Sequence, residues 1–233
     1  MFRDALPFAF RCSLLSVLLF ATVNAHAEPL GSYQPRFSAS LGARVSKVAD
    51  AGFDPFADSD ELPQVSLGVS VTALRWRRFS LVGAGYWDYG QRADRARGAE
   101  TELDVHRLSV GPELRYHLLA PLYVFAQVLP AFAHSEATLQ DSAAAALRSS
   151  NRWAYGVDLS AGAAFQVYGM RSPESAKPRL WVIAQGGYGY LGSTQLRLVP
   201  ESGEGAPERT APLDLGTLSL SGPFLRVSAA VSF

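Results

Sequence analysis

Three neighbouring residues, His134, Ser135 and Glu136, have the side-chain types of an acyl-transfer site. In such a site a histidine takes the proton of a serine nucleophile, and a carboxylate orients the histidine. Neighbouring side chains on a strand or loop point apart, so we do not expect these three to act together. The sequence therefore predicts no enzyme, and a lipid-modifying hydrolase or acyltransferase that uses His134 and Ser135 is kept as an alternative.

A second group of polar residues is acidic and contains no basic residue: Asp50, Asp54, Asp58, Asp60 and Glu61. Carboxylates at this density are ligands for a hard cation such as Ca²⁺. The EF-hand order of acidic residues around a central glycine is absent, however. We interpret the segment as a solvated acidic loop and predict no metal site. Phe53 and Phe56 in the same loop are candidates for contact with a partner.

Gly187, Gly189 and Gly192 have the spacing of a dinucleotide-binding fingerprint. That fingerprint works at a turn between a strand and a helix. These glycines lie in a segment whose alternation predicts a strand, so we expect no cofactor.

Composition narrows the class of protein. The 233 residues include 21 basic and 21 acidic side chains, and 48 % of the residues are hydrophobic. This balance excludes a disordered chain and predicts no nucleic-acid partner. The single cysteine, Cys12, excludes a disulfide scaffold and a multi-cysteine metal site.

The first 27 residues have the organisation of a secretory signal peptide. Arg3 and Arg11 precede an apolar segment at 14–23, which is followed by Ala25, His26 and Ala27. A basic start, a short apolar core and an A-x-A site are typical of export. We therefore predict a signal peptide at 1–27 and a single domain at 28–233.

The rest of the chain alternates between apolar and small polar residues with a period of two, which predicts strands. The eight expected strands lie at 37–45, 65–73, 79–89, 105–117, 122–133, 153–165, 180–190 and 225–231. In the fourth strand the apolar phase changes between Val105 and Leu108, which we interpret as a bulge near His106. The fifth strand is apolar on both faces, and its orientation is left open.

The connections between these strands alternate in length. Two are short, at 75–78 and 117–121, one at 168–178 is intermediate, and four are long, at 49–63, 90–102, 134–151 and 199–217. Tight turns on one side and long loops on the other are typical of an outer-membrane barrel. The sequence thus predicts an all-β fold, an eight-stranded antiparallel up-and-down transmembrane β-barrel with its apolar face toward lipid. A soluble barrel with its apolar face inward is the alternative.

Aromatic residues gather at the ends of the expected strands, where a membrane barrel carries two girdles. The expected girdles are Trp76, Phe79, Tyr116, Tyr123, Trp181 and Phe233 on the turn side, and Trp87, Tyr89, Trp153, Tyr155 and Tyr190 on the loop side.

The last strand ends in a pattern that resembles the C-terminal signal of bacterial outer-membrane proteins: Leu225, Val227, Ala229, Val231 and Phe233. Together with the signal peptide and the eight strands, the chain resembles the small outer-membrane β-barrel family, which includes OmpA-type transmembrane domains, OmpX and opacity-like proteins. The resemblance implies a bacterial outer-membrane location among lipids and lipopolysaccharide, and recognition by the barrel-assembly machinery. It covers residues 35–233 and ends with the barrel, so anchoring to the cell wall is not expected.

The polar face of the expected strands includes seven charged residues: Arg44, Asp88, Glu113, Arg115, Arg152, Asp158 and Arg226. Eight strands leave an interior that side chains fill, and buried charges are costly unless paired. We therefore predict a lumen charge network with little or no pore activity, and a structural or surface-interaction, adhesion-like role. A narrow small-solute channel remains an alternative, and an extracellular ligand of the loops and the oligomeric state are left open.

Overall fold

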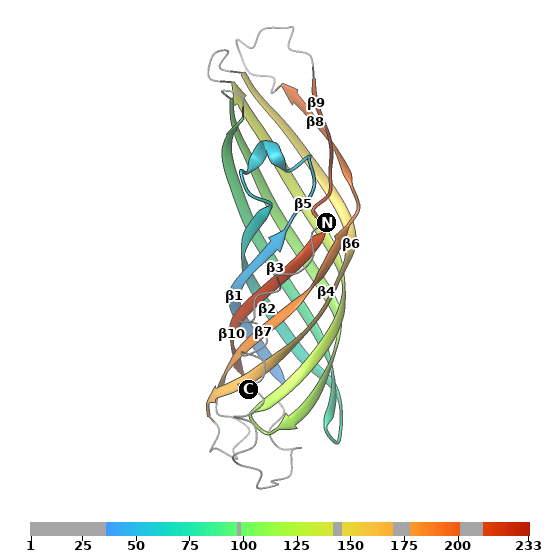
Figure 1. Cartoon of the computed structure of the whole chain (residues 1–233). Coiled ribbons are helices and arrows are strands. Elements are labelled where there is room, and N and C mark those ends of the chain that lie inside the picture. Colours follow the sequence, from blue (N-terminus) through green and yellow to red (C-terminus); the bar gives the residue numbers. More distant parts are fainter. Residues whose placement is uncertain (1–35, 97–98, 142–145, 170–177, 201–211) are drawn as a thin grey trace, which may run out of the picture.

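Eight strands form a closed antiparallel ring in the computed structural model (Figure 1). The structure describes residues 36–96, 99–141, 146–169, 178–200 and 212–233, so the predicted signal peptide at 1–27 lies outside the described residues. The ring strands are β1 (Phe37–Lys47), β2 (Glu61–Trp76), β3 (Phe79–Ala96), β4 (Ala99–Leu119), β5 (Leu122–Asp141), β6 (Ala146–Tyr168), β7 (Arg179–Leu191) and β10 (Gly222–Ser232). Each pairs with the next ring strand along the chain, and β1 pairs with β10. The predicted eight-stranded up-and-down barrel is confirmed.

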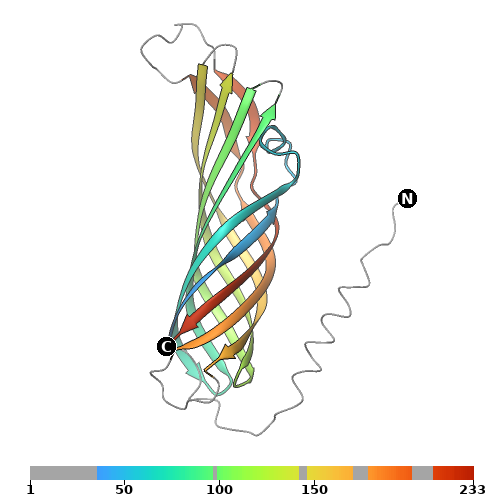
Figure 2. The ribbon, with the colours of Figure 1, turned by 90° about the vertical axis from the view of Figure 1, so that its left-hand side faces the viewer.

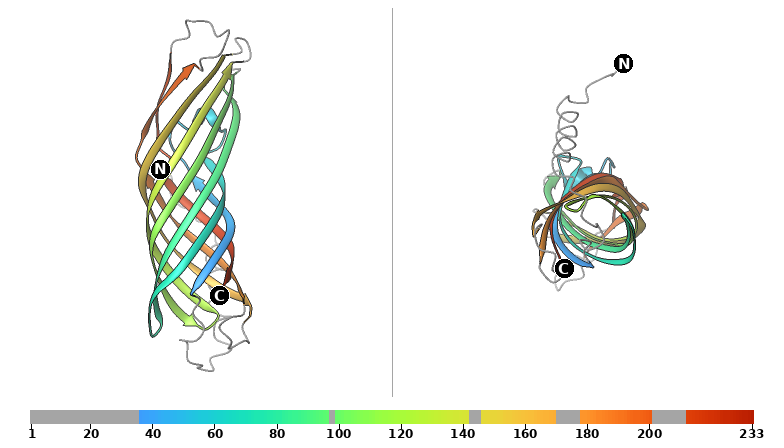
Figure 3. Two further views of the ribbon diagram at one scale, coloured as in Figure 1. Left: turned by 180° about the vertical axis from the view of Figure 1, so that it is seen from behind. Right: turned by 90° about the horizontal axis from the view of Figure 1, so that it is seen from below.

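Three further elements lie at one end of the ring. The short 3₁₀ helix η2 (Asp54–Phe56) connects β1 to β2, and β8 (Thr194–Pro200) pairs with β9 (Leu213–Leu218) and with β6. We call this end the loop end, and the opposite end, where β1 begins and β10 finishes, the turn end (Figures 2 and 3). Among the described residues, no helix has the length and apolar character needed to cross a membrane.

The apolar side chains of the strands point outward from the ring. Leu67, Val69 and Val227 are 43 %, 55 % and 58 % exposed, whereas Ser66 and Ser228, one residue away, are buried inside. The predicted assembly signal shares this outward face: Leu225, Val227, Ala229, Val231 and Phe233. Successive side chains of a strand point to opposite faces, so the barrel has an apolar outside and a polar inside along most of its height.

Strand β5, which is apolar on both faces, is oriented by its neighbours. Its pairing with β4 and β6 directs Tyr123, Phe125 and Gln127 into the ring and Val124 and Val128 outward. The orientation that the sequence left open is therefore settled by the register of the sheet.

Two of the predicted long loops are largely strand and a third is partly strand, which corrects the sequence interpretation. Strand β3 runs to Ala96 and β4 begins at Ala99, inside the expected loop 90–102. Strand β5 runs to Asp141 and β6 begins at Ala146, inside the expected loop 134–151. The end of β8 and all of β9 except Leu218 lie inside the expected loop 199–217. The barrel is consequently extended at its loop end, as Figure 1 shows.

The apolar pattern inverts along the strands where this extension begins. In β4 the inward residues change from apolar Val105 to Arg107, while the outward residues change from Asp104 to Leu108. The pairing of β4 with β3 is continuous across this change, so the bulge predicted near His106 is wrong. A sheet with one face in water is polar on that face and apolar on the buried face. In the sequence, such an exchange of the apolar and polar positions looks like the end of one strand and the start of a loop.

Inside the loop end, the buried side chains form an apolar cluster. It comprises Val48, Phe53, Phe56, Leu62, Leu103, Val105, Ala131, Ala133, Ala137, Leu191, Leu196, Leu198, Leu218 and Leu220. Phe53 and Phe56 flank or belong to η2 and are 1 % and 0 % exposed, so the expectation that they contact a partner is wrong. Thr101 Oγ1 donates to the Pro55 carbonyl at 2.6 Å. The β1–β2 connection therefore folds into the barrel mouth and fills it.

Candidate functional site in the barrel lumen

Charged side chains from five strands meet inside the ring. Arg44 Nη1 of β1 donates to Asp88 Oδ2 of β3 at 3.0 Å and to Asp158 Oδ2 of β6 at 2.9 Å. Arg107 of β4 also pairs with Asp158, and Arg226 of β10 donates to Asp88 at 2.6 Å. These five buried residues, which we call the central charge cluster, include three cations and two anions. The cluster therefore holds a net charge of one positive unit.

The register of the sheet places these residues at one level of the barrel. Arg44 lies directly opposite Arg226 on β10, and Asp88, the carboxylate that both guanidinium groups bind, offsets their repulsion. Asp158 lies opposite Gly189 on β7. A Cβ added at Gly189 would come within 2.6 Å of Arg107 Nη2 and 2.7 Å of Asp158 Oδ1. Glycine at this position makes room for the ion pairs.

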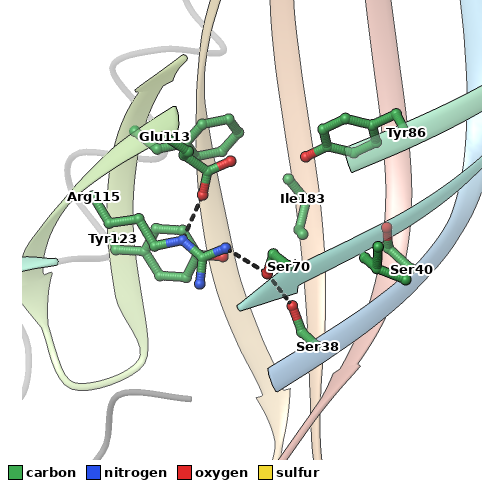
Figure 4. A pocket seen from close by; sticks show the side chains of 10 residues that line it. Ser38, Ser40, Ser70, Tyr86, Glu113, Arg115, Tyr123 and Ile183 are labelled. Atoms are coloured by element: carbon green, nitrogen blue, oxygen red, sulfur yellow. Dashed lines mark hydrogen bonds and ion pairs between the residues drawn. The ribbon is translucent and has the colours of Figure 1, made fainter. Parts of the chain in front are cut away.

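A second ion pair lies between the central charge cluster and the turn end (Figure 4). Arg115 pairs with Glu113 and donates from Nη2 to Ser70 Oγ at 2.9 Å. Ser70 Oγ in turn shares a hydrogen bond with Ser38 Oγ at 2.6 Å. The cavity that these residues line with Tyr86 and others has room for about one water molecule. Side chains thus fill this level of the lumen almost completely.

Aromatic side chains close the lumen toward the turn end. Tyr123, Phe125 and Trp181 are buried in one cluster with Ala164 and Ala230. Trp181 Nε1 donates to Ser232 Oγ at 2.8 Å. The prediction that Tyr123 and Trp181 belong to an outer girdle is therefore wrong, because both point inward. Outward aromatic residues do occur at both levels: Trp76, Phe79 and Phe233 toward the turn end, and Trp87, Trp153, Tyr155 and Tyr190 toward the loop end.

Six of the seven predicted lumen charges are buried inside the barrel: Arg44, Asp88, Glu113, Arg115, Asp158 and Arg226. Arg152 is exposed instead, and its Nε donates to the Gln195 carbonyl at 3.4 Å in the extension of the sheet. Arg107 is not among the predicted lumen residues, because the bulge predicted near His106 leaves open which face of β4 Arg107 occupies. The polar residues Ser109, Glu113 and Arg115 on the same face of β4 were the signal that could have identified it.

Several polar atoms of the central charge cluster are buried without a hydrogen-bond partner among the described residues. They are Asp88 Oδ1, Arg107 Nε and Arg226 Nε. Two of the guanidinium groups lie over aromatic rings, with Arg44 3.8 Å from the centroid of Phe224 and Arg226 4.1 Å from that of Tyr86. Cation–π contacts of this kind partly replace the lost hydration. The ion pairs of the cluster connect side chains of five strands across the lumen.

The residue types of an acyl-transfer site do not assemble at His134. Ser135 is buried inside the ring, whereas His134 and Glu136 lie on the outer face of β5. His134 instead belongs to an outward row of directly paired residues across four strands: Tyr89, His106, His134 and Trp153. The rings of His134 and Trp153 lie 4.7 Å apart, and those of Tyr89 and His106 4.8 Å apart.

The acidic residues of the β1–β2 connection and the glycines of β7 lie in positions that their local backbone structure explains. No group of three or more His, Cys, Asp or Glu residues in the described part of the chain is placed to hold a metal ion. Asp50 Oδ1 accepts a hydrogen bond from the Gly52 backbone at 2.9 Å, which stabilises the β1–β2 connection. Gly187 and Gly189 lie within β7, and not at a turn between a strand and a helix.

No family model matches the chain, and no curated protein matches it either. Solved structures do. Ail, the attachment invasion locus protein of Yersinia pestis, is 12 % identical over 86 % of this chain and 99 % of its own, with a TM-score of 0.46. Ail in complex with the heparin analogue sucrose octasulfate gives 13 % identity over 84 % and 97 %, with a TM-score of 0.48. Neisserial surface protein A gives 11 % over 84 % and 97 %, with a TM-score of 0.40.

Proposed function

We propose that this chain is an integral protein of the bacterial outer membrane, with a closed lumen and a structural or surface-interaction role. The observation that carries the proposal is the inside-out distribution of side chains, with apolar residues outside the ring and the central charge cluster inside it. In water such an outer surface would be a very large apolar patch, which soluble monomers rarely expose. In a bilayer the same surface faces hydrocarbon.

The height of the apolar surface supports this environment. Strand β1 has 11 residues. At about 3.3 Å per residue and a tilt of about 45°, a strand of this length covers about 26 Å of bilayer, close to the apolar band of outer-membrane barrels. The longer strands β3 to β6 have the additional length to extend beyond the membrane at the loop end.

The filling of the lumen favours little or no pore activity over a narrow channel. A solute entering from the loop end would meet the apolar cluster around Phe53 and Phe56, and then the central charge cluster. Beyond these lie the second ion pair and the aromatic cluster of Tyr123 and Trp181. A continuous water path would require all four layers to open.

The surface-interaction role is supported by the shape of the loop end. The hairpins β3–β4 and β5–β6 are paired almost to their tips, at Ala96–Ala99 and Asp141–Ala146. Paired strands present side chains more rigidly than an irregular loop, and rigid surfaces lose less entropy on binding. We propose an extracellular ligand for this surface, with outer-membrane lipids and lipopolysaccharide around the barrel.

Assembly by the barrel-assembly machinery is proposed from the outward row on the last strand, which ends at Phe233. Replacing Phe233 with Ala removes the terminal ring from that row. We expect less mature barrel in the outer membrane and more unfolded precursor in the periplasm. Ser228→Ala, on the inward face of the same strand, is the matched control.

The experiment that tests the proposed function combines location, folding and conductance. The protein is expected in the outer-membrane fraction, with faster gel migration before boiling than after it, which is typical of folded barrels. In planar bilayers it should show little or no steady conductance. Recovery as a detergent-free soluble monomer would contradict the membrane location, and a large stable channel would contradict the closed lumen.

A further inference from the structure

Basic side chains gather at the turn end of the barrel. The described residues there include Arg36, Arg75, Arg77, Arg78 and Arg179, and no Asp or Glu side chain. The loop end has the opposite character, since its acidic side chains outnumber its basic ones. Among the described residues, the positive side chains therefore concentrate at the turn end.

Most of this positive charge lies on the β2–β3 turn and next to it. The turn consists of Arg77 and Arg78, and Arg77 adopts a left-handed backbone conformation with φ 52°. Arg75, Arg77 and Arg78 are all exposed. The Arg36 carbonyl accepts a hydrogen bond from the Thr72 backbone at 2.9 Å, so the start of β1 runs beside the same hairpin. We call Arg36, Arg75, Arg77 and Arg78 the arginine rim.

The arginine rim lies next to the edge of the apolar outer surface at the turn end. Leu74 and Trp76 point outward and are 66 % and 69 % exposed, and Phe79, which pairs with Trp76, also faces outward. The rings of Trp76 and Phe79 are stacked, and the Arg77 guanidinium lies 6.0 Å from the Trp76 ring. Tryptophan favours the boundary between hydrocarbon and headgroups. The next residues along the chain are therefore at headgroup level.

We propose that the arginine rim binds the phosphate groups of anionic glycerophospholipids in the leaflet that surrounds the turn end. The proposal rests on the membrane location proposed above. A planar guanidinium group donates two parallel hydrogen bonds to a phosphate, and it remains charged at any physiological pH. The guanidinium groups of Arg77 and Arg78 lie in the turn itself, with Arg36 and Arg75 beside it, and this positive cluster complements anionic headgroups.

The location of the rim favours a lipid as the occupant. The same hairpin carries Leu74, Trp76 and Phe79 toward the acyl chains, so one molecule with an apolar tail and an anionic head satisfies both parts of the surface. A basic side chain near an anionic membrane surface contributes about 1 kcal/mol. This corresponds to about a five-fold change in affinity for each arginine.

The test measures lipid binding to the folded, detergent-solubilised protein by native mass spectrometry. Phosphatidylglycerol and phosphatidylcholine with identical acyl chains are the probes. We expect tighter binding of the first phosphatidylglycerol molecule, and a loss of this preference at high salt. The variant Arg77→Asn with Arg78→Gln should weaken phosphatidylglycerol binding by roughly 25-fold, five-fold for each arginine, and leave phosphatidylcholine binding unchanged. Asparagine is chosen because it tolerates a positive φ.

Two controls separate the outcomes. The variant Arg95→Gln with Arg152→Gln removes two exposed cations at the loop end and should retain the preference. Replacing Arg77 and Arg78 with Lys keeps the charge and should retain most of it. Equal binding of the two lipids by the wild type, or an unchanged preference in the Asn/Gln variant, overturns the proposal while heat-modifiable migration still supports a membrane barrel. If the Asn/Gln variant fails to fold, the salt dependence of the wild-type preference decides.

Discussion

Asp158 accepts hydrogen bonds from Arg44 at 2.9 Å and from Ser109 at 3.0 Å, and it also pairs with Arg107. It thus joins strands β1, β4 and β6 through one carboxylate. Removing one partner of a buried ion pair leaves an uncompensated charge, which costs more than the pair itself contributes. The central charge cluster already holds one excess positive charge, so the loss of an anion is expected to be especially unfavourable.

Replacing Asp158 with Asn should lower the free energy of unfolding by about 3–5 kcal/mol, because two guanidinium groups lose a charged acceptor. Urea unfolding of the reconstituted barrel, followed by tryptophan fluorescence, measures this change. Glu100→Gln is the matched control, since Glu100 pairs with Arg95 at 2.8 Å on the exposed surface. That change should cost less than about 1 kcal/mol. Similar losses in the two variants would contradict the importance of the central charge cluster.

Gly189→Ala tests the space that the cluster requires. Its Cβ would press against Arg107 Nη2 and Asp158 Oδ1, at 2.6 and 2.7 Å. We expect a loss of about 1–3 kcal/mol from this overpacking, measured by the same unfolding experiment. Gly83→Ala is the control, because the nearest atom to its added Cβ would be 3.9 Å away. An unchanged midpoint for Gly189→Ala would show that the side chains move aside freely.

At the scale of elements, the β1–β2 connection is held in the barrel mouth by two buried rings. Phe53 and Phe56 pack against the apolar cluster of the loop end. Removing a buried phenylalanine ring costs about 3–5 kcal/mol. That cost falls on a connection and not on the ring of strands, so it is expected to release the connection without unfolding the barrel.

The double variant Phe53→Ala with Phe56→Ala should make residues 49–60 sensitive to added protease while heat-modifiable migration is retained. Limited proteolysis with mass spectrometry of the fragments measures the effect. Asp58→Ala is the control, because Asp58 is an exposed residue of the same connection. Equal resistance of the double variant and the wild type would argue against the packing of η2 inside the mouth.

The strands and their outward apolar sides could be predicted, since alternation such as Leu67-Ser66 or Val227-Ser228 reports directly which face is apolar. The strands of the loop end could not be predicted, because the alternation continues there with apolar residues pointing inward and polar residues pointing outward. Val105 and Leu108 are both apolar, and only the pairing of β4 with β3 shows that one points inward and the other outward. This one misinterpretation explains the false bulge near His106 and the omission of Arg107.

Long-range packing accounts for the remaining errors at the candidate site. Tyr123 and Trp181 lie near strand ends and have the side chains of girdle residues, and their inward direction follows only from the register of β5 and β7. Arg152 has the alternation of a lumen residue, yet it lies where β8 replaces β7 as the neighbour of β6. Such changes of neighbour leave no local mark in the sequence.

At the scale of the whole molecule, one ring of strands has two environments. Outward positions such as Val69 are apolar in the part toward the turn end, whereas outward positions in the extension at the loop end, such as Gln91 and Glu136, are polar. The proposed membrane therefore surrounds only the part toward the turn end. A charge placed on the outer face should reveal this boundary.

Val69→Arg should destabilise the reconstituted barrel by about 2–4 kcal/mol, whereas Ala93→Arg should cost no more than about 1 kcal/mol, because the penalty depends on depth in the bilayer. Both residues are exposed and outward, on the neighbouring strands β2 and β3. Urea unfolding in vesicles measures both. A larger loss for Ala93→Arg would place the bilayer around the opposite end of the barrel.

The exchange of apolar and polar positions on the outer face of β4 has a consequence for the depth of the barrel in the proposed membrane. It is complete between Val105 and Leu108, which is about 10 Å along a strand and about 7 Å of depth at a tilt of about 45°. The sequence of β4 thus defines where the boundary between hydrocarbon and water crosses the outer face of the barrel. In the proposed membrane, a thicker bilayer would bring the carboxylates of Asp104 and Glu136 into the hydrocarbon, and a thinner one would leave Leu108 in water. We therefore expect the barrel to be most stable in bilayers within a narrow range of thickness.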